Sequence, residues 1–446
     1  MATDIEYALM AGRAYQSTRA AINLLPDLQA LGWAEFFLQQ QPSGFEAISF
    51  QKGTNIVISF AGTGTAVDWW ANAGGFFGVT SEQLKQAADY YLQVKAANPG
   101  ATISFTGHSL GGGLASLMAV FFGETATTFD QAPFRNSASA SVATSLYLLL
   151  TQQGYSETAL QGLANFISAP ASVGIPNESN VHDISVQGEI LSAASGLRIG
   201  TATSLTHGAP DLLMAISLHS QALLSAFVQN NQFREVTLTL PDVVRMIFDS
   251  KLFEHTTARS NAINENFIER LVRHQNGIAG LAVGETTIPA DGMLTRYTND
   301  LWKLAQDGGL TMSEGTSFFG NNLNNVSKAL IAFAMQKYYD EQLAAGATPT
   351  ELFTDLTMAG SGSGGGGVQF DRADVAATLD KAKGYDLYFK NYLKSDAFTN
   401  NERPLIQSLL PTLRDWYVQA GLGGMNATDA HNRGAFMLGG DRKSVV

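Results

Sequence analysis

Cysteine is absent from all 446 residues of the sequence, which excludes disulfide bonds and thiolate metal sites. Lysine and arginine are also scarce, with 27 against 39 aspartates and glutamates and a formal net charge of -12. Such a balance argues against a nucleic-acid partner. Long apolar runs are missing too: residues 146–150 fall far short of the roughly 20 apolar residues of a membrane-spanning helix. We therefore expect neither a nucleic-acid partner nor a transmembrane segment.

The most informative segment that is present covers residues 107–111, Gly-His-Ser-Leu-Gly. Residues 101–106 before it are typical of a buried parallel strand, and residues 114–120 after it are good helix formers. A Gly-x-Ser-x-Gly pattern in that context holds its serine in a strained turn, with the hydroxyl clear of the sheet. The pattern also arises by chance in a chain with 44 glycines, but its neighbours favour Ser109 as a nucleophile.

A second segment, residues 55–63, reads as a buried strand that ends in a Gly-Thr turn. Acyl transfer through serine needs two backbone N–H groups for the oxyanion. One comes from the residue after the nucleophile and one from the loop after an earlier strand. Thr63 and Leu110 are therefore the candidate oxyanion donors. The alternative is that the Gly-Thr pair only ends a strand.

These two segments together resemble the class 3 lipases of the α/β-hydrolase superfamily. The resemblance covers roughly the first half of the chain and rests on residues 58–63, Asp68, Trp69, Asn72 and residues 107–112. It implies an α/β fold with a mostly parallel central sheet. It also implies a serine carboxylic-ester hydrolase that acts on lipid esters, a lipase or a phospholipase A1-like enzyme. The family usually carries arginine where Ala61 stands, so we expect the oxyanion loop to be braced differently.

The chain order of this fold puts the catalytic acid after the serine and before the histidine. Residues 180–190 alternate as a strand that is predicted to end at Gly-Glu. Glu189 is therefore the preferred acid. Asp183 is its rival, but it falls at the front of the strand, whereas sites of open α/β sheets form at the carboxyl ends.

Seven histidines compete for the role of base. His108 inside the elbow is expected to pack, and His182 precedes both acid candidates. His219, at the head of an apolar helix with a loop upstream, is preferred over His207, which lies in a loop rich in helix breakers. The remaining three, His255, His274 and His431, fall in the helical second half and read as surface or core residues.

With these roles, His219 takes the Ser109 proton as the oxygen attacks an ester, and Glu189 orients the imidazole. An acyl-enzyme forms and water releases the acid. This chemistry requires no cofactor and no metal, so the sequence predicts no metal site.

Two apolar segments bear on the substrate and on a lipid-water interface. Trp69, Trp70, Phe76 and Phe77 follow the oxyanion turn, where lipases of this family often have a lid or an acyl-groove wall. Residues 139–167 are two helix-like stretches at a position where caps are often inserted. Core packing is the alternative for both segments.

The domain organisation follows from these patterns and from the length. Residues 1–235 are predicted to form the catalytic domain. Residues 236–440 are predicted to form a mainly helical accessory region, with a Gly/Ser linker at 360–367. Residues 441–446 coincide with the translation of a common sequencing adapter and are expected to be a non-native tail.

Localisation is argued from both ends of the sequence. Residues 4–10 lack the pattern of a secretory signal, which alone indicates a cytoplasmic protein. Residues 438–441, Leu-Gly-Gly-Asp, resemble the opening of the calcium-binding nonapeptides of RTX proteins. We therefore expect a secreted bacterial protein, with calcium as a structural ion if such repeats follow.

Two other functions remain open at this point. A serine peptidase or an acyltransferase would share the fold and the elbow. A non-catalytic lipid-binding or membrane-damaging protein would keep a degenerate hydrolase core.

Overall fold

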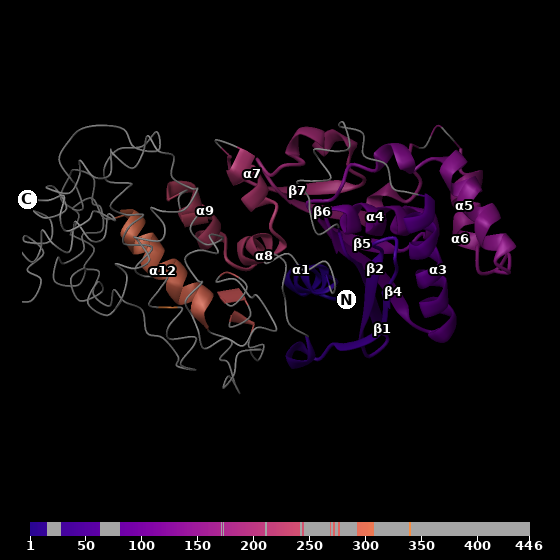
Figure 1. Ribbon diagram of the computed structural model, residues 1–446, viewed down its shortest axis with the longest axis horizontal. Coiled ribbons are helices and arrows are strands. Elements are labelled where there is room, and N and C mark those ends of the chain that lie inside the picture. Colours follow the sequence, from indigo (N-terminus) through magenta and orange to yellow (C-terminus); the bar gives the residue numbers. More distant parts are fainter. Residues whose placement is uncertain are drawn as a thin grey trace, which may run out of the picture. The chain divides into compact units, whose positions relative to one another are not determined.

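The computed structural model describes residues 1–15, 28–62, 81–170, 172, 174–209, 212–240, 243–244, 268, 271–272, 275–276, 292–306 and 339. Figure 1 shows how their elements are arranged. By its internal contacts the chain divides into two compact units, Met1–Gln229 with Ile263–Ala279, and Asn230–Ala262 with Gly280–Val446. Within the described ranges, every helix is too short or too polar to cross a membrane.

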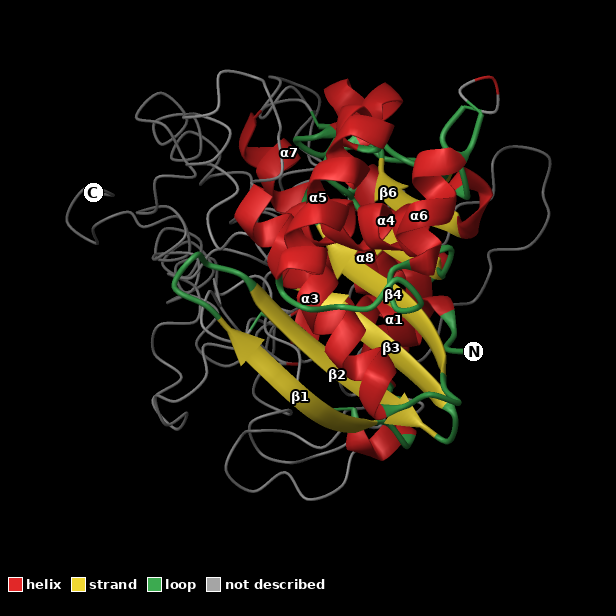
Figure 2. Cartoon of the chain, turned by 90° about the vertical axis from the view of Figure 1, so that its right-hand side faces the viewer, coloured by secondary structure: helices red, strands yellow, loops and turns green. Residues whose placement is uncertain are grey.

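The first unit is built on a seven-stranded sheet in which strand order follows chain order. The first three strands pair antiparallel, and every pairing from the third to the seventh strand is parallel. The strands are β1 (Ala34–Gln40), β2 (Glu46–Lys52), β3 (Asn55–Phe60), β4 (Thr102–His108), β5 (Thr125–Phe129), β6 (Val181–Val186) and β7 (Thr201–Leu205). Figure 2 shows the sheet with β1 at its edge. This topology confirms the predicted α/β fold with a mostly parallel sheet, that of an α/β hydrolase.

Helices cover both faces of the sheet. Those of the first unit are α1 (Asp4–Arg13), α3 (Ser81–Ala97), α4 (Leu110–Phe122), α5 (Ala140–Gln152), α6 (Gln161–Ser168), α7 (Leu212–Leu218) and α8 (Gln221–Gln229). Short 3-10 turns lie at Gln29–Leu31, Arg135–Ser137, Glu178–Asn180 and Ser192–Leu197. As Figure 1 shows, α1 and α8 lie on one side of the sheet, and α3, α5 and α6 lie on the other. The second unit contains α9 (Asn231–Thr239) and α12 (Met293–Gln306).

The central strand β4 explains this two-sided covering, because successive side chains of a strand point to opposite faces. Ile103 and Phe105 face α3 and α4 and join the hydrophobic core on that side. Ser104 faces α1 and accepts a 2.9 Å hydrogen bond from the Tyr7 hydroxyl. Thr106, two residues on, donates to the Tyr7 carbonyl at 3.3 Å. One face of β4 is thus apolar and the other carries buried polar bonds to the N-terminal helix.

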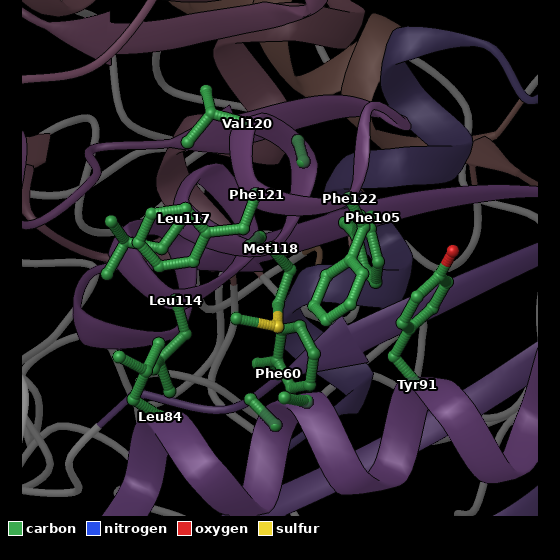
Figure 3. Close-up of a cluster of buried hydrophobic side chains, with 14 of the residues drawn as sticks. Phe60, Leu84, Tyr91, Phe105, Leu114, Leu117, Met118, Val120, Phe121 and Phe122 are labelled. Atoms are coloured by element: carbon green, nitrogen blue, oxygen red, sulfur yellow. The ribbon is translucent and has the colours of Figure 1, made fainter. Parts of the chain in front are cut away.

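Aromatic rings fill the core between the sheet and helices α3 and α4, as the close-up in Figure 3 shows. Phe60 of β3 stacks on Phe105 of β4 with ring centroids 6.0 Å apart. Tyr91 of α3 lies 5.3 Å from Phe105 and 4.7 Å from Phe122. Each such ring contributes roughly 1.5–3 kcal/mol by leaving water. This core fixes α4, and therefore Ser109 directly before it, against the carboxyl end of β4.

The local sequence predictions can be compared with these elements. The strands expected at residues 55–63 and 101–106 correspond to β3 and β4, and the helices expected within 139–167 are α5 and α6. The strand expected at 180–190 was wrong at its end, because β6 stops at Val186. Gly188, with φ of 88°, then turns the chain. His219 lies at the head of α8 as expected, and the short helix α7 separates it from the loop at residues 206–209.

Several predictions concern residues outside the described ranges. They are the linker at 360–367, the RTX-like residues 438–441 and the tail at 441–446. The boundary predicted between residues 235 and 236 stays a prediction; it falls within α9.

Candidate active site

Ser109 occupies the turn between β4 and α4. Its backbone has φ of 57° and ψ of -125°, a conformation that a residue with a side chain rarely adopts. The turn is possible because glycines flank it: a Cβ atom on Gly111 would overlap the Phe60 carbonyl, and one on Gly107 would overlap Gly111. Ser109 is 9% exposed. The sequence therefore folds here into a strained elbow that presents a hydroxyl at the end of the sheet.

His219 lies between α7 and α8 and joins two other side chains. The Ser109 hydroxyl donates to His219 Nε2 at 2.9 Å. On the other side of the ring, His219 Nδ1 donates to Glu189 Oε2 at 2.7 Å. Three of the predicted site residues are thus brought together in one chain of hydrogen bonds. The arrangement can move a proton from serine to imidazole while a carboxylate holds the ring in the required tautomer.

Glu189 follows β6 and is 2% exposed. Its Oε2 also accepts the Leu191 N–H at 2.7 Å, and its Oε1 accepts Arg198 Nη2 at 2.6 Å. Burial alone would raise the pKa of this carboxyl, but the hydrogen bond and charge of His219, the charge of Arg198 and the Leu191 amide outweigh it. The pKa of Glu189 is therefore lower than its ordinary value, and the carboxylate beside His219 is ionised.

Arg198 connects Glu189 to a second buried carboxylate. Its Nη1 lies 3.4 Å from Asp183 Oδ2, and its Nε donates to the Gln131 carbonyl at 3.0 Å. Asp183 itself accepts Thr128 Oγ1 at 3.0 Å and the Gln131 N–H at 3.3 Å. The rival acid therefore lies in this network, and the carboxylate that contacts His219 is Glu189.

His108 lies beneath the turn at Ser109, where its Nδ1 is hydrogen-bonded to the Tyr15 hydroxyl oxygen at 2.8 Å. Tyr15 also packs closely against Gly62, the residue before the predicted oxyanion donor Thr63. A Cβ atom added to Gly62 would overlap the Tyr15 hydroxyl oxygen. That same Cβ atom would lie 3.2 Å from the Ser109 Cβ. The chain that leads to Thr63 therefore passes directly beside the nucleophile.

The other histidines have different partners. His207 stacks on Phe227 with ring centroids 5.6 Å apart, and its Nδ1 accepts the Gly208 N–H at 2.9 Å. His182 Nε2 lies 2.8 Å from Thr203 Oγ1, between β6 and β7. The remaining three, His255, His274 and His431, lie outside the described residues.

Of the residues predicted for the oxyanion hole and the lid, Leu110 alone lies within the described ranges. Leu110 is the first residue of α4, so its N–H belongs to the N-terminal turn of that helix, where the dipole favours negative charge. The other predicted donor, Thr63, lies outside the described residues, as do the predicted lid residues Trp69, Trp70, Phe76 and Phe77. Their roles stay predictions.

Sequence reasoning missed three residues of this neighbourhood: Tyr15, Asp130 and Arg198. Asp130 directly follows β5 and is fully buried, with φ of 42°. Its position after a β-branched run is the same signal that indicated the other strand-end residues, so it could have been found. Tyr15 and Arg198 carry no local pattern, because their partners lie in other segments: His108 is 93 residues from Tyr15, and Glu189 and Asp183 are 9 and 15 residues from Arg198.

The comparisons with known proteins agree with this geometry. Residues 6–237 match the family model described as phospholipase-like, Tle-like phospholipase domain. Over 134 residues the chain is 35% identical to the extracellular phospholipase A1 of Serratia liquefaciens, a match that covers 29% of this chain. The chain spans about two fifths of the length of that relative, 42%.

Among solved structures, the native complex of Rhizomucor miehei lipase with its propeptide aligns with 42% of this chain and 61% of that one. The sequence identity is 15% and the TM-score is 0.27.

The family match covers more than half of the 446 residues and includes Ser109, Glu189 and His219. It confirms the expected lipase or phospholipase type of family, while the RTX repeats stay a prediction. The chain belongs to the family of Tle-like phospholipase domains.

Proposed function

We propose that this chain hydrolyses carboxylic esters of lipids, with phospholipids cleaved in the manner of a phospholipase A1. The observation that carries the proposal is the hydrogen-bonded series Ser109, His219 and Glu189 at 2.9 and 2.7 Å. Membership of a phospholipase-like family and the likeness to the Serratia phospholipase A1 support the choice of lipid esters.

The proposed mechanism begins when Ser109 Oγ attacks the ester carbonyl and gives its proton to His219 Nε2. Glu189 stabilises the imidazolium that forms, since its carboxylate is ionised and held by Arg198. The backbone N–H groups of Leu110 and Thr63 would bind the oxyanion. His219 then protonates the leaving alcohol, and a water molecule, deprotonated by His219, releases the fatty acid from Ser109.

Substrate selection in this proposal falls to the apolar residues after the oxyanion turn. Trp69, Trp70, Phe76 and Phe77 would shield an acyl chain at a lipid-water interface. The serine chemistry of this scheme needs no cofactor. Secretion is part of the proposal as well, supported by the extracellular Serratia relative.

The central test is the hydrolysis of phospholipid vesicles and p-nitrophenyl esters by Ser109→Ala. Loss of a triad nucleophile costs several orders of magnitude, so we expect less than roughly 1% of the wild-type rate. Ser116→Ala is the matched control, because Ser116 is a buried serine of α4 that bonds the Gly113 carbonyl at 2.8 Å. Residual hydrolysis above that level in Ser109→Ala contradicts a serine nucleophile.

Two further measurements separate the other functions. Cleavage of peptides with no cleavage of esters would indicate a serine peptidase, and acyl transfer to an added alcohol in preference to water would indicate an acyltransferase. Labelling of Ser109 by a fluorophosphonate is expected for any of these enzymes. Its absence in the folded protein would favour a non-catalytic lipid-binding protein.

A further inference from the structure

Two histidines and an aspartate meet at the carboxyl end of the sheet. One nitrogen each of His108 and His219 and one carboxylate oxygen of Asp130 lie within 4.8 Å of one another. All three side chains are buried, with residue exposures of 2%, 3% and 0%. Among the described residues, this is the one group of three or more His, Cys, Asp or Glu that could hold a metal ion.

Two of these side chains have an unused polar atom. His108 Nδ1 is occupied by the Tyr15 hydroxyl at 2.8 Å, and Asp130 Oδ1 accepts the Val186 N–H at 2.8 Å. His108 Nε2 and Asp130 Oδ2 have no hydrogen-bond partner within the described part of the chain. The main chain of His219 approaches the His108 ring without reaching hydrogen-bond geometry at Nε2. A buried polar group without a hydrogen-bond partner destabilises the folded state by about 1–3 kcal/mol. Two such atoms therefore indicate that a bound ion or molecule satisfies them.

The surrounding charge favours a cation. Asp130, Asp183 and Glu189 are three buried carboxyl groups, and Arg198 is the cation that contacts Asp183 and Glu189 at 3.4 and 2.6 Å. Burial and the neighbouring charge of Glu189 raise the pKa of Asp130 well above its ordinary value, and a cation bound to this carboxyl would replace its proton and stabilise the ionised form.

We propose that His108, Asp130 and His219 bind a divalent transition metal ion of the zinc type, and that the bound ion inhibits hydrolysis. Two imidazoles and one carboxylate suit zinc, whereas calcium and magnesium require more oxygen ligands. Ligands about 2 Å from one ion lie roughly 3–4 Å apart, so the three side chains need to move inward by about 1 Å or less. The sequence alone did not predict this site.

The ion would inhibit hydrolysis because it binds the nitrogen of His219 that receives the Ser109 proton. His219 Nδ1 donates to Glu189 at 2.7 Å, so its lone pair is on Nε2, where the Ser109 proton is received. An ion on Nε2 replaces that hydrogen bond and removes the base. This part of the inference rests on the proposed function, while the binding of the ion does not.

The binding test uses the full-length chain after treatment with a chelator and measures zinc uptake by competition with a chelating dye. We expect Ser109→Ala, which keeps all three ligands, to bind one zinc ion per chain. Adding Asp130→Asn or His108→Gln to it should weaken binding by about 10–100-fold. His182→Asn is the matched control, because it removes an imidazole of β6 that is not part of the proposed site. It should not change the affinity for zinc. Equal affinity in all four proteins would mean adventitious binding only and would overturn the proposal.

The inhibition test measures ester hydrolysis with added zinc, calcium or magnesium chloride, each variant being compared with its own metal-free rate. Zinc should inhibit the wild-type chain reversibly, with activity restored by a chelator, and calcium and magnesium should not. Asp130→Asn should need at least about 10-fold more zinc for half-inhibition. Zinc should also slow fluorophosphonate labelling of Ser109. Equal inhibition of Asp130→Asn and wild type would refute the site.

The two experiments separate this inference from the proposed function. Zinc binding that depends on Asp130, in a chain without hydrolysis, would leave the metal site in place and refute the hydrolase. Hydrolysis that requires Ser109, in a chain that binds no zinc, would support the hydrolase and refute the metal site.

Discussion

Arg198 Nη2 donates to Glu189 Oε1 at 2.6 Å, on the carboxylate oxygen that does not contact His219. The two oxygens of Glu189 therefore have separate partners, a permanent cation on one side and the imidazole on the other. Since the Arg198 side chain is 6% exposed, this ion pair is hardly screened by water. Its main effect is to keep the carboxylate oriented and ionised beside His219.

Arg198→Ala is expected to destabilise the folded protein strongly. Removing the guanidinium leaves Glu189 and Asp183 as buried carboxylates without their cation, and breaking a buried pair in this way costs about 3–5 kcal/mol. Lys95→Ala is the control, because the pair of Lys95 with Glu124 is half-exposed at 3.1 Å and should contribute about 0–1 kcal/mol. Urea denaturation measures both. Equal losses in the two variants would mean that Arg198 is dispensable for the network.

The sequence could predict the parts of this neighbourhood that are encoded locally. The turn at Ser109 was predictable because its strand, its glycines and its helix are contiguous. The choice of Glu189 and His219 relied on chain order, and the two could be named only with Asp183 and His207 as rivals, because the distance between them is a tertiary property.

The network around Arg198 was not predictable in that way. Its guanidinium reaches Asp183, Glu189 and the Gln131 carbonyl, and no sequence period relates these positions. The ending of β6 was misjudged for a similar reason, since residues 187–190 continue the alternation while Gly188 turns the backbone. Antiparallel β1 and β2 were not anticipated either.

His219→Ala is expected to lower kcat/KM for ester hydrolysis by several orders of magnitude, as severely as Ser109→Ala, because both remove the same proton transfer. His207→Ala should lose less than about tenfold, since His207 stacks on Phe227 and is not in the series of hydrogen bonds. Steady-state kinetics on one ester give both values, with circular dichroism to establish that the variants are folded. The opposite ranking would assign the role of base to His207.

Gly111→Ala is expected to prevent the elbow from forming. The added methyl group would overlap the Phe60 carbonyl, which is backbone and cannot move aside. We expect a loss of at least about 3 kcal/mol, the upper end of the range for overpacking. Gly100→Ala is the matched control, because nothing lies within 4 Å of its Cβ position, and it should change stability by less than about 0.5 kcal/mol. Thermal unfolding compares the two, and a Gly111→Ala protein as stable as Gly100→Ala would show that the elbow can widen.

Glu6→Gln tests how the N-terminal helix is held, through its dependence on pH. Glu6 accepts the Thr3 N–H at 2.8 Å and the Trp33 Nε1–H at 2.9 Å, and it lies 3.4 Å from Lys52. Burial raises the pKa of Glu6, but these partners together outweigh it and bring the pKa below the ordinary value of 4.5. The folded state therefore favours the ionised form. Its stabilisation is complete above that value and is lost as the pH falls through the lower folded pKa.

At neutral pH the wild-type chain should accordingly be more stable than Glu6→Gln, by no more than about 1 kcal/mol because solvent screens a side chain near the surface. The difference should shrink as the pH falls below about 4 and vanish once both states are protonated. Urea midpoints across this range measure it. Glu157→Gln, at an exposed turn before α6, is the control and should stay within about 0.5 kcal/mol throughout. A difference for Glu6→Gln that grows on acidification would show that the folded state favours the protonated acid instead.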